Sequence, residues 1–323
     1  MTDARPTLYL SRLLPDPIMA IVREQFQLVQ EPLDALPALL ELREGLCQAD
    51  VAIVTLGDRI DAETIHAATR LKILANYAVG YNNIDLAAAR ARDLIVTNTP
   101  DVLTDATADL TWALLLATAR RVVEGDALIR SGQWTGWSPT QLLGAEVSGK
   151  TLGIIGMGRI GQAVARRAVG FRMPVRYHTR QYKATASLPR EWEYRSLQDL
   201  LREADVVTIH VPLLPATHHL IGARELAWMR PTAFLINTAR GPIVDEGALV
   251  EALKTGIIAG AGLDVYEQEP ALHSGLAQLE QVVLLPHLGS ATLHARTQMG
   301  LVCLENIHAV LDGRPAPNEV HSQ

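Results

Sequence analysis

The sequence has 323 residues, of which 48% are hydrophobic and 20% are charged, and its formal net charge at pH 7 is −6. Disordered chains combine low hydrophobicity with high net charge, so these values indicate a folded chain, and its length suits about two domains. The acidic balance argues against a chain-wide nucleic-acid surface, because such a surface needs a basic excess to displace counterions from phosphates. The two cysteines, Cys47 and Cys303, are too few for a disulfide or zinc framework, so no metal site is expected.

The N-terminal segment does not match a secretory signal, because Arg12, Pro15 and Pro17 interrupt the apolar run that such a signal needs. No stretch offers about 18 consecutive apolar residues for a membrane span. Together with the scarcity of cysteine, these features predict a cytoplasmic protein that binds neither membrane nor nucleic acid.

Short runs of β-branched residues alternate with helical patterns from the start of the chain, which is typical of an α/β fold with a parallel sheet. In the first part we expect helices over residues 17–27, 62–68 and 86–91, and strands over residues 7–10, 50–55, 71–75 and 94–97. From residue 104 to 131, apolar residues recur at helical spacing, which predicts one buried helix that carries the chain between domains. A loop over residues 132–144 then ends that crossing.

A second series of strands is expected near residues 151–155, 175–177, 205–211, 233–237, 258–263 and 282–285. Six strands suit a complete dinucleotide-binding sheet. The last helical pattern, residues 293–311, has no strand after it, so we expect it to pack on the first domain and to make that domain discontinuous. The predicted domains are therefore residues 100–287 and residues 1–99 with 288–323.

A glycine fingerprint follows the first strand of the second series and opens a helix. It reads Gly156, Met157, Gly158, Arg159, Ile160, Gly161, which is the pattern G-x-G-x-x-G. In that setting the glycines close a tight turn and bring backbone N–H groups to a pyrophosphate at the helix N-terminus. The fingerprint predicts a dinucleotide site, and the alternative is a tight turn without a ligand.

The residues after the next strand bear on the choice between NAD and NADP. An NAD site places Asp or Glu there to bind the ribose 2′-hydroxyl, whereas this chain has His178, Thr179 and Arg180 and no acid until Glu191. A guanidinium and a hydroxyl would bind a 2′-phosphate instead, and residues 147–190 contain nine Lys or Arg and no Asp or Glu. We therefore expect NADP(H), while a solvated Arg180 with NAD held weakly stays open.

Three later strand ends carry polar residues at the edge where an open α/β sheet binds its ligand, namely Arg240, Glu269 and His287. Reduction of a 2-keto acid needs a fixed cation on the carboxylate and carbonyl, which suits Arg240, and a proton donor active near pH 7, which suits His287. Glu269 would favour the imidazolium if it were hydrogen-bonded to that ring. The alternative roles are a surface charge for Arg240, a solvated turn residue for Glu269 and a backbone cap for His287. Asp264 could face the nicotinamide amide or serve as a structural cap.

Several runs together carry a family resemblance. They are residues 75–85, 97–109, 153–161, 236–245, 259–270 and 286–292. In these runs the chain resembles the D-isomer-specific 2-hydroxyacid dehydrogenases, and within them it is most similar to the glyoxylate reductases, also called glyoxylate/hydroxypyruvate reductases. The resemblance spans roughly residues 70 to 313, and the first 70 residues share only the pattern.

The resemblance implies Arg240, Glu269 and His287 as the catalytic set and a substrate carboxylate bound by the backbone at Val79 and Gly80. It implies a cofactor domain with a doubly wound parallel sheet, inserted in a discontinuous flavodoxin-like substrate domain, both of them Rossmann-like. The expected cofactor-binding residues are Thr107, Gly156, Met157, Gly158, Arg159, Ile160, Gly161, His178, Thr179, Arg180, Thr238, Ala239, Arg240, Asp264, His287 and Gly289.

The family further implies a homodimer in which the long helix and the loop after it embrace the partner. Trp137 lies in that loop, and the resemblance suggests that it enters the neighbouring subunit's active site and restricts substrate size. Packing within the interface is the alternative role for this side chain.

The sequence therefore predicts an NADPH-dependent reductase of glyoxylate and hydroxypyruvate. One alternative is an NAD-linked dehydrogenase of D-lactate, D-glycerate or a larger acid. The other is a non-catalytic nucleotide-sensing protein, similar to the corepressors that resemble this family.

Overall fold

The structure is a computed structural model that describes residues 5–180 and 188–320. The chain divides into two compact units, the first comprising the residues up to Leu103 and from Ser290 onward, the second Thr104–Gly289. The boundaries differ from those expected by four residues at the first crossing and two at the second. The second difference has a local cause, because the turn at Gly289 is hydrogen-bonded to Thr107 and Asp264 of the second unit.

The first unit is a five-stranded parallel sheet in the order β2-β1-β3-β4-β5. This is the flavodoxin-like order 2-1-3-4-5, so that part of the prediction is confirmed. The strands are β1 (Thr7–Leu10), β2 (Gln27–Leu28), β3 (Val51–Val54), β4 (Ile73–Asn76) and β5 (Ile95–Thr97). The two-residue strand β2 was not predicted, since its length gives no pattern to detect.

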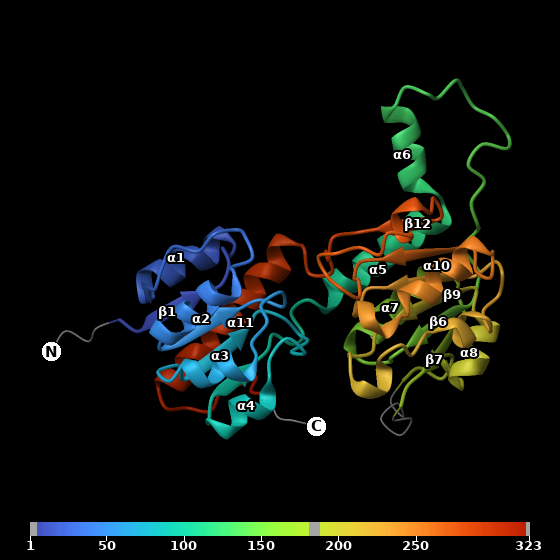
Figure 1. Cartoon of the computed structure of the whole chain (residues 1–323). Coiled ribbons are helices and arrows are strands. Elements are labelled where there is room, and N and C mark those ends of the chain that lie inside the picture. Colours follow the sequence, from blue (N-terminus) through green and yellow to red (C-terminus); the bar gives the residue numbers. More distant parts are fainter. Residues whose placement is uncertain (1–4, 181–187, 321–323) are drawn as a thin grey trace. The chain divides into compact units, whose positions relative to one another are not determined.

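Helices cover the sheet of the first unit on both faces. They are α1 (Asp16–Gln25), α2 (Leu39–Gln48), α3 (Ala62–Ala67), α4 (Leu86–Ala91) and α11 (Leu293–Leu311). The C-terminal helix α11 packs so closely on α1 that a Cβ on Gly300 would lie 2.5 Å from Ile18 Cγ1. Figure 1 shows the red α11 among the blue elements of this unit, which confirms the predicted return of the last helix.

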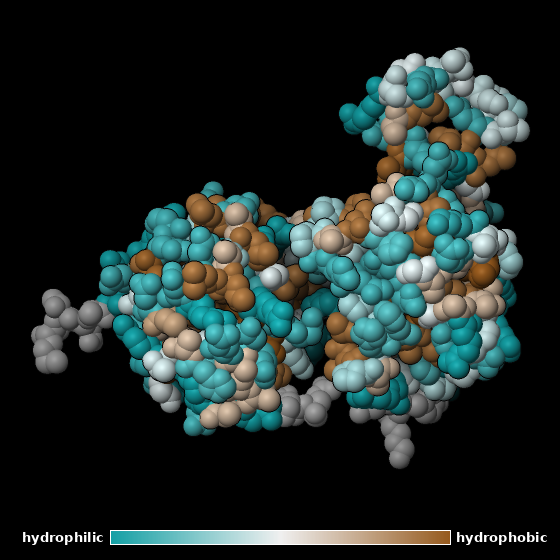
Figure 2. Space-filling view, in the orientation of Figure 1, coloured by the Kyte–Doolittle hydropathy of each residue, from teal (hydrophilic) through white to brown (hydrophobic). Residues whose placement is uncertain are grey.

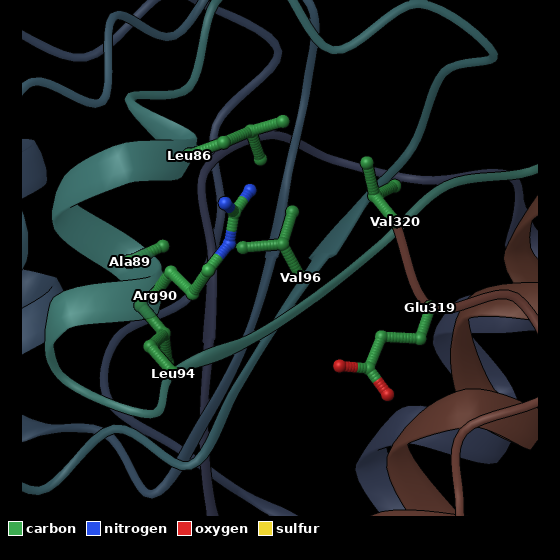
Figure 3. A pocket seen from close by; sticks show the side chains of 7 residues that line it. All are labelled: Leu86, Ala89, Arg90, Leu94, Val96, Glu319 and Val320. Carbon is green, nitrogen blue, oxygen red and sulfur yellow. The ribbon is translucent and has the colours of Figure 1, made fainter. Parts of the chain in front are cut away.

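The C-terminal segment of the chain covers the edge strand of the first sheet. The Val320 amide donates to Val96 O at 2.8 Å, and Glu319 forms an antiparallel bridge with Thr97. Beside this segment, a surface pocket of about 280 Å³ opens between α4 and β5 (Figure 3). Its lining includes Arg90 and none of the residues that the sequence analysis singled out.

The second unit is a seven-stranded parallel sheet in the order β12-β11-β10-β9-β6-β7-β8. Numbered within the unit and read from β8, the order is 3-2-1-4-5-6-7, whose first six strands have the doubly wound dinucleotide-binding order. The strands are β6 (Leu152–Ile155), β7 (Val175–His178), β8 (Glu193–Tyr194), β9 (Val206–Ile209), β10 (Phe234–Asn237), β11 (Gly260–Leu263) and β12 (Val282–Leu284). The expected number of six was one too few, because β8 is two exposed residues at the sheet edge.

Two apolar cores lie on opposite faces of this second sheet. Helices α5 (Thr104–Ala119) and α7 (Arg159–Ala168) enclose one, and α8 (Leu197–Glu203), α9 (Ala223–Leu226) and α10 (Glu246–Lys254) enclose the other. A Cβ on Gly262 of β11 would lie 2.7 Å from Leu114 Cγ of α5, so helix and strand are in close contact. This packing fixes the carboxyl ends of the strands, where the candidate site residues lie.

The prediction of a single buried helix over residues 104–131 is wrong for the second half of that range. The helix breaks at Arg121, which adopts a left-handed backbone with φ of 54°, and α6 (Val122–Arg130) begins there with no buried residue. The chain returns to its starting point, because the Ala145 amide donates to Ala119 O at 2.8 Å. Residues 120–144 therefore form an arm that projects from the unit (Figure 1).

The arm exposes large apolar side chains. Figure 2 shows brown patches in the arm, between teal and white residues. The exposed side chains include aliphatic residues and two tryptophans. They are Val122, Val123, Ile129, Trp134, Trp137 and Leu143. None of the helices in residues 5–180 and 188–320 is both long and apolar enough to cross a membrane.

Candidate functional site

The three glycines of the fingerprint differ in the space around them and in backbone conformation. Gly156 has φ of +100°, and a Cβ there would lie 2.5 Å from His210 O, while a Cβ on Gly161 would lie 2.0 Å from Gly156 O. Gly158 has φ of −77° and open space where a Cβ would stand. The fold therefore needs Gly156 and Gly161 but not Gly158. The open space above Gly158, at the N-terminus of α7, fits a dinucleotide whose pyrophosphate approaches the backbone.

We predict that Gly158→Ala leaves the fold intact and weakens NADPH binding about tenfold or more, because the new methyl group occupies space needed only by a ligand. Fluorescence titration with NADPH and a thermal melt would measure the two effects. Gly170→Ala is a matched control, since Gly170 also has no neighbour within 4 Å and lies after α7. Unchanged NADPH affinity in Gly158→Ala would contradict a dinucleotide at this turn.

The end of β7 lies directly beside the glycine turn, because the Gly156 amide donates to His178 O at 2.8 Å. The His178 ring is bound through Nδ1 to Arg195 O at 3.1 Å and stacks on Tyr194. Thr179 is half-buried and Arg180 is exposed. The residues expected to contact a 2′-phosphate are thus adjacent to the turn, with Thr179 and Arg180 more accessible than the engaged ring of His178.

Carboxylates near β7 are engaged by arginines of the same sheet edge. Glu193 on β8 pairs with Arg176 at 2.9 Å, and Glu203 pairs with Arg195 at 3.0 Å. These ion pairs reduce the negative charge that would oppose a phosphate at the end of β7.

His210 is a half-buried histidine at the point where the strand order reverses, between β6 and β9. Its amide donates to Ile155 O at 2.7 Å, and its Nε2 is buried without a partner among residues 5–180 and 188–320. Burial lowers the pKa of His210 to about 3, so the ring is neutral. The sequence did not single out this residue, although a histidine at the end of an apolar strand beside the fingerprint strand was a usable signal.

His287 and Glu269 form a direct pair. His287 Nδ1 lies 2.8 Å from Glu269 Oε2, and Glu269 Oε1 accepts the Tyr266 amide at 3.0 Å. Burial acts to raise the pKa of Glu269, but the bond and charge of His287, the Tyr266 amide and the charge of Arg240 outweigh it and lower that pKa. Glu269 is therefore an anion near neutral pH and can accept a hydrogen bond from Nδ1 of the paired imidazole.

Asp264 caps the turn that follows His287. Its two carboxylate oxygens accept the amides of Leu288 and Gly289 at 2.6 and 2.8 Å, and the Thr107 hydroxyl donates to Gly289 O at 3.0 Å. The pKa of Asp264 is raised, chiefly by burial. Asp264 therefore serves as a structural cap, and its expected position facing the nicotinamide amide stays a prediction. His287 itself has φ of 54°, and these bonds stabilise that turn.

Arg240 is held by its own loop after β10. Asn237 Nδ2 donates to Arg240 O at 3.0 Å, and Asn237 Oδ1 accepts the Ala239 amide at the same distance. Thr238 contacts Thr111 of α5 through their hydroxyl groups at 2.9 Å. Burial lowers the pKa of Arg240, opposed by the charge of Glu269, yet a guanidinium keeps its proton in proteins. A fixed, half-buried cation therefore lies at this strand end.

Gly241 joins the Arg240 segment to the Glu269 segment. A Cβ on Gly241 would lie 1.8 Å from the carbonyl carbon of Tyr266, so the two backbones touch where only glycine fits. Tyr266 in turn donates from its hydroxyl to Leu285 O at 2.8 Å, two residues before His287. All three predicted catalytic residues are thus carried by segments in mutual contact. Asn237 and Gly241 were missed as site-forming residues, and the only signal was their position at a strand end.

Val79 and Gly80 belong to the first unit, in the loop after β4. Asn98 Nδ2 donates to Val79 O and Asn76 Nδ2 to Gly80 O, both at 2.8 Å. These hydrogen bonds fix the two carbonyl groups, which orients the loop and its amides.

Trp137 lies in the arm, where its side chain is 82% exposed. Within residues 5–180 and 188–320, no cluster of three His, Cys, Asp or Glu side chains could hold a metal ion.

Comparison with known families gives one domain match, to the NAD binding domain of the D-isomer specific 2-hydroxyacid dehydrogenases over residues 112–289. Among curated relatives, the glyoxylate reductase of Thermococcus gammatolerans is 47% identical over 323 residues, which cover 99% of this chain and 97% of that protein. The glyoxylate reductase of Pyrococcus horikoshii is 46% identical over 324 residues, with 99% and 97% coverage.

Solved structures show the same fold. The TT0316 protein from Thermus thermophilus superposes with a TM-score of 0.91 at 47% identity, covering 98% of this chain and 100% of that one. An NADPH-dependent glyoxylate/hydroxypyruvate reductase from Sinorhizobium meliloti, in complex with NADP and malonate, has a TM-score of 0.86 at 33% identity, with 98% and 97% coverage.

Proposed function

The chain belongs to the D-isomer specific 2-hydroxyacid dehydrogenase family and is an NAD(P)-dependent dehydrogenase, and on that premise we propose that it reduces glyoxylate and hydroxypyruvate with NADPH. The observation that carries the proposal is the 2.8 Å pair of Glu269 and His287 on a segment that touches the loop of Arg240. The names of the relatives support glyoxylate as substrate, and the Sinorhizobium meliloti enzyme is described as NADPH-dependent.

In this proposal the second unit binds the cofactor and the first unit binds the substrate. The bound dinucleotide supplies a hydride to the keto carbon. Arg240 binds the substrate carboxylate and polarises the carbonyl, assisted by the amides of Val79 and Gly80. Thr107, Asp264 and Gly289 hold the turn of His287 in place at the nicotinamide end of the cofactor site.

Proton transfer depends on the Glu269–His287 pair. Glu269 accepts the Nδ1–H bond and so orients the ring, which leaves the proton on Nε2 for the forming alkoxide oxygen. After the transfer the ring is neutral, and the anionic Glu269 favours its reprotonation from solvent. General acid catalysis of this kind contributes about 10²- to 10⁴-fold to a rate.

The proposed preference for NADP(H) rests on the end of β7. His178, Thr179 and Arg180 lie there, and the sequence has no Asp or Glu between the glycine turn and these residues. A guanidinium fork binds a 2′-phosphate strongly, whereas a ribose hydroxyl there finds no acid. Use of NAD(H) at lower affinity is compatible with the same residues.

We predict that Arg180→Ala raises the KM for NADPH about tenfold and leaves the KM for NADH unchanged, because only NADPH carries the 2′-phosphate. Initial rates at 340 nm with both cofactors would measure this. Arg166→Ala, an exposed arginine in the last turn of α7, serves as the charge-matched control. Equal effects on both cofactors would refute a role for Arg180 at the phosphate.

The competing functions separate in one panel of rates, with NADPH and NADH each tested on glyoxylate, hydroxypyruvate and pyruvate. Faster turnover with NADH and pyruvate would establish the NAD-linked dehydrogenase instead. Tight NADPH binding without any absorbance change at 340 nm would establish a nucleotide-sensing protein. The intact set of Arg240, Glu269 and His287 favours turnover.

We also propose a homodimer formed through the arm. Its apolar side chains are exposed in the single chain, and contiguous exposed apolar patches commonly mark interfaces. Val123 and Ile129 are 53% and 57% exposed on α6, although both are large and apolar. In the dimer, Trp137 of the arm narrows the substrate site of the partner subunit.

We predict that Trp137→Ala raises the ratio of kcat/KM for a larger 2-keto acid over that for glyoxylate about tenfold, while the dimer persists, because removal of the indole enlarges the site. Light scattering during size-exclusion chromatography would monitor the dimer. The double variant Val123→Asp, Ile129→Asp is expected to be monomeric. A constant ratio with a weakened dimer would assign Trp137 to interface packing alone.

A further inference from the structure

Two glutamates outside the catalytic set hold each other by reciprocal hydrogen bonds. The Glu267 amide donates to Glu246 Oε1 at 2.8 Å, and the Glu246 amide donates to Glu267 Oε1 at 2.8 Å. Glu246 is the first residue of α10, and Glu267 lies two residues before Glu269. We refer to Glu246 and Glu267 together as the glutamate clasp.

The clasp joins two segments of the proposed site, one that carries Arg240 and one that carries Glu269. One segment runs from Arg240 through Gly241 to Glu246, and the other runs from Asp264 through Glu267 to Glu269. They already touch at Gly241, where a Cβ would lie 1.8 Å from Tyr266. The clasp is a second attachment five residues further along the first segment. Two attachments fix the orientation of one segment on the other, which a single contact does not.

The surroundings of the clasp show that the Glu246 side chain is held inside the protein and does not lie free at the surface. Glu246 is only 6% exposed, which is rare for a glutamate that is not bound by other groups. Burial raises the pKa of Glu246, and the charges of Glu267 and Glu269 add to this effect. The hydrogen bond from the Glu267 amide and the charge of His273 act in the opposite direction but do not outweigh it. His219 approaches from the loop before α9, with Nε2 at 3.3 Å from Glu267 Oε1 and Nδ1 at 3.9 Å from Asp245 Oδ2.

We propose that Glu246 and Glu267 are positioning residues for the reduction. Their reciprocal hydrogen bonds hold the segment of Glu269 so that the Glu269 carboxylate contacts His287, and they keep the Arg240 segment in place beside it. The inference rests on the proposed roles of Glu269, His287 and Arg240. Loss of the clasp removes one of the attachments between the Glu269 segment and the Arg240 segment and leaves the contact of Gly241 with Tyr266. The Glu269–His287 bond then lengthens, and the imidazolium is favoured less.

Alanine and glutamine substitutions separate positioning from charge. A glutamine side-chain oxygen still accepts the amide bond but carries no charge, whereas alanine loses both. We expect Glu246→Ala and Glu267→Ala to lower kcat about 10- to 100-fold and to move the basic limb of the pH profile of kcat/KM about one unit lower. Glu246→Gln and Glu267→Gln are expected to stay within about threefold of wild type, with the limb unmoved. The KM for NADPH should be unchanged in all four.

The design keeps folding and function apart. Glu267→Ala opens no cavity as large as that of the buried Glu246→Ala, so it tests the clasp if the latter fails to fold. The double alanine variant should be no worse than either single one, because both remove the same clasp. Glutamine variants as impaired as the alanine variants would show that charge, not positioning, matters and would overturn the proposal. Alanine variants with a wild-type pH profile and kcat would do the same.

Failure of the proposed function has a different signature. If the wild-type protein turns over no 2-keto acid, or if Glu269→Gln leaves the basic limb in place, the assignment of the catalytic set is wrong before the clasp is tested. If the wild-type protein is active and Glu269→Gln moves the limb, the outcome for the alanine variants bears on the clasp alone.

Discussion

Replacing Arg240 with alanine is expected to lower the rate of glyoxylate reduction about a thousandfold or more while NADPH still binds. Arg240 is the fixed, half-buried cation of the proposed site, and its loss removes both the carboxylate clamp and the polarisation of the carbonyl. Removal of one preorganised donor to a developing oxyanion already costs about 10²- to 10³-fold. NADPH binding is expected to persist because the glycine turn and residues 178–180 lie at the ends of other strands, β6 and β7.

Steady-state rates and NADPH fluorescence titration measure the two effects separately. Arg240→Lys should recover only part of the rate, since an ammonium offers no planar fork for a carboxylate. Turnover close to wild type in Arg240→Ala would exclude Arg240 from the reaction. Loss of NADPH binding together with activity would instead point to a misfolded loop after β10.

Gly241→Ala is expected to destabilise the second unit by about 3 kcal/mol or more and to abolish activity. The new Cβ would lie 1.8 Å from the Tyr266 carbonyl carbon, and the atom it meets is backbone, so no side-chain movement relieves the overlap. A loss of that size lowers the melting temperature of a unit this long on the order of 10 °C. Separation of the two segments would also displace Glu269 from His287.

Differential scanning calorimetry and a rate assay test this expectation. Gly247→Ala, in the first turn of α10, provides the contrast, because an added Cβ there meets only Asp245 Oδ1 at 3.4 Å, an ordinary contact. Alanine in a helix is favoured over glycine by about 1 kcal/mol, so this variant should be as stable as wild type or more stable. A Gly241→Ala protein with an unchanged melting temperature would be incompatible with the described packing.

Local patterns in the sequence were sufficient to identify the α/β class and the main strands of both units. The carboxyl ends of parallel strands meet at one edge of a sheet, so the polar residues after β10, β11 and β12 could be grouped before their contacts were known. The discontinuous first unit followed from the last helix lacking a strand after it. These inferences succeed because periodicity and strand order are properties of neighbouring residues.

The helix over residues 104–131 shows where periodicity is not enough. The spacing of apolar residues continues through Arg121, but the burial ends there, because the chain leaves the sheet and returns by the bond between Ala145 and Ala119. An apolar residue that faces solvent in the single chain has the same sequence pattern as one in a core.

The sequence by itself determined the glycine turn, the absence of an acid after β7 and the three candidate catalytic side chains, because each depends on residue type at a strand end. Only the tertiary structure decided how those side chains are held. Asp264 caps the His287 turn rather than standing open to solvent, Gly241 admits Tyr266, and Glu246 binds Glu267 across 21 positions of sequence. The physical reason is that a hydrogen bond or a van der Waals contact depends on distance in space, and residue spacing along the chain does not encode the distance between separate loops.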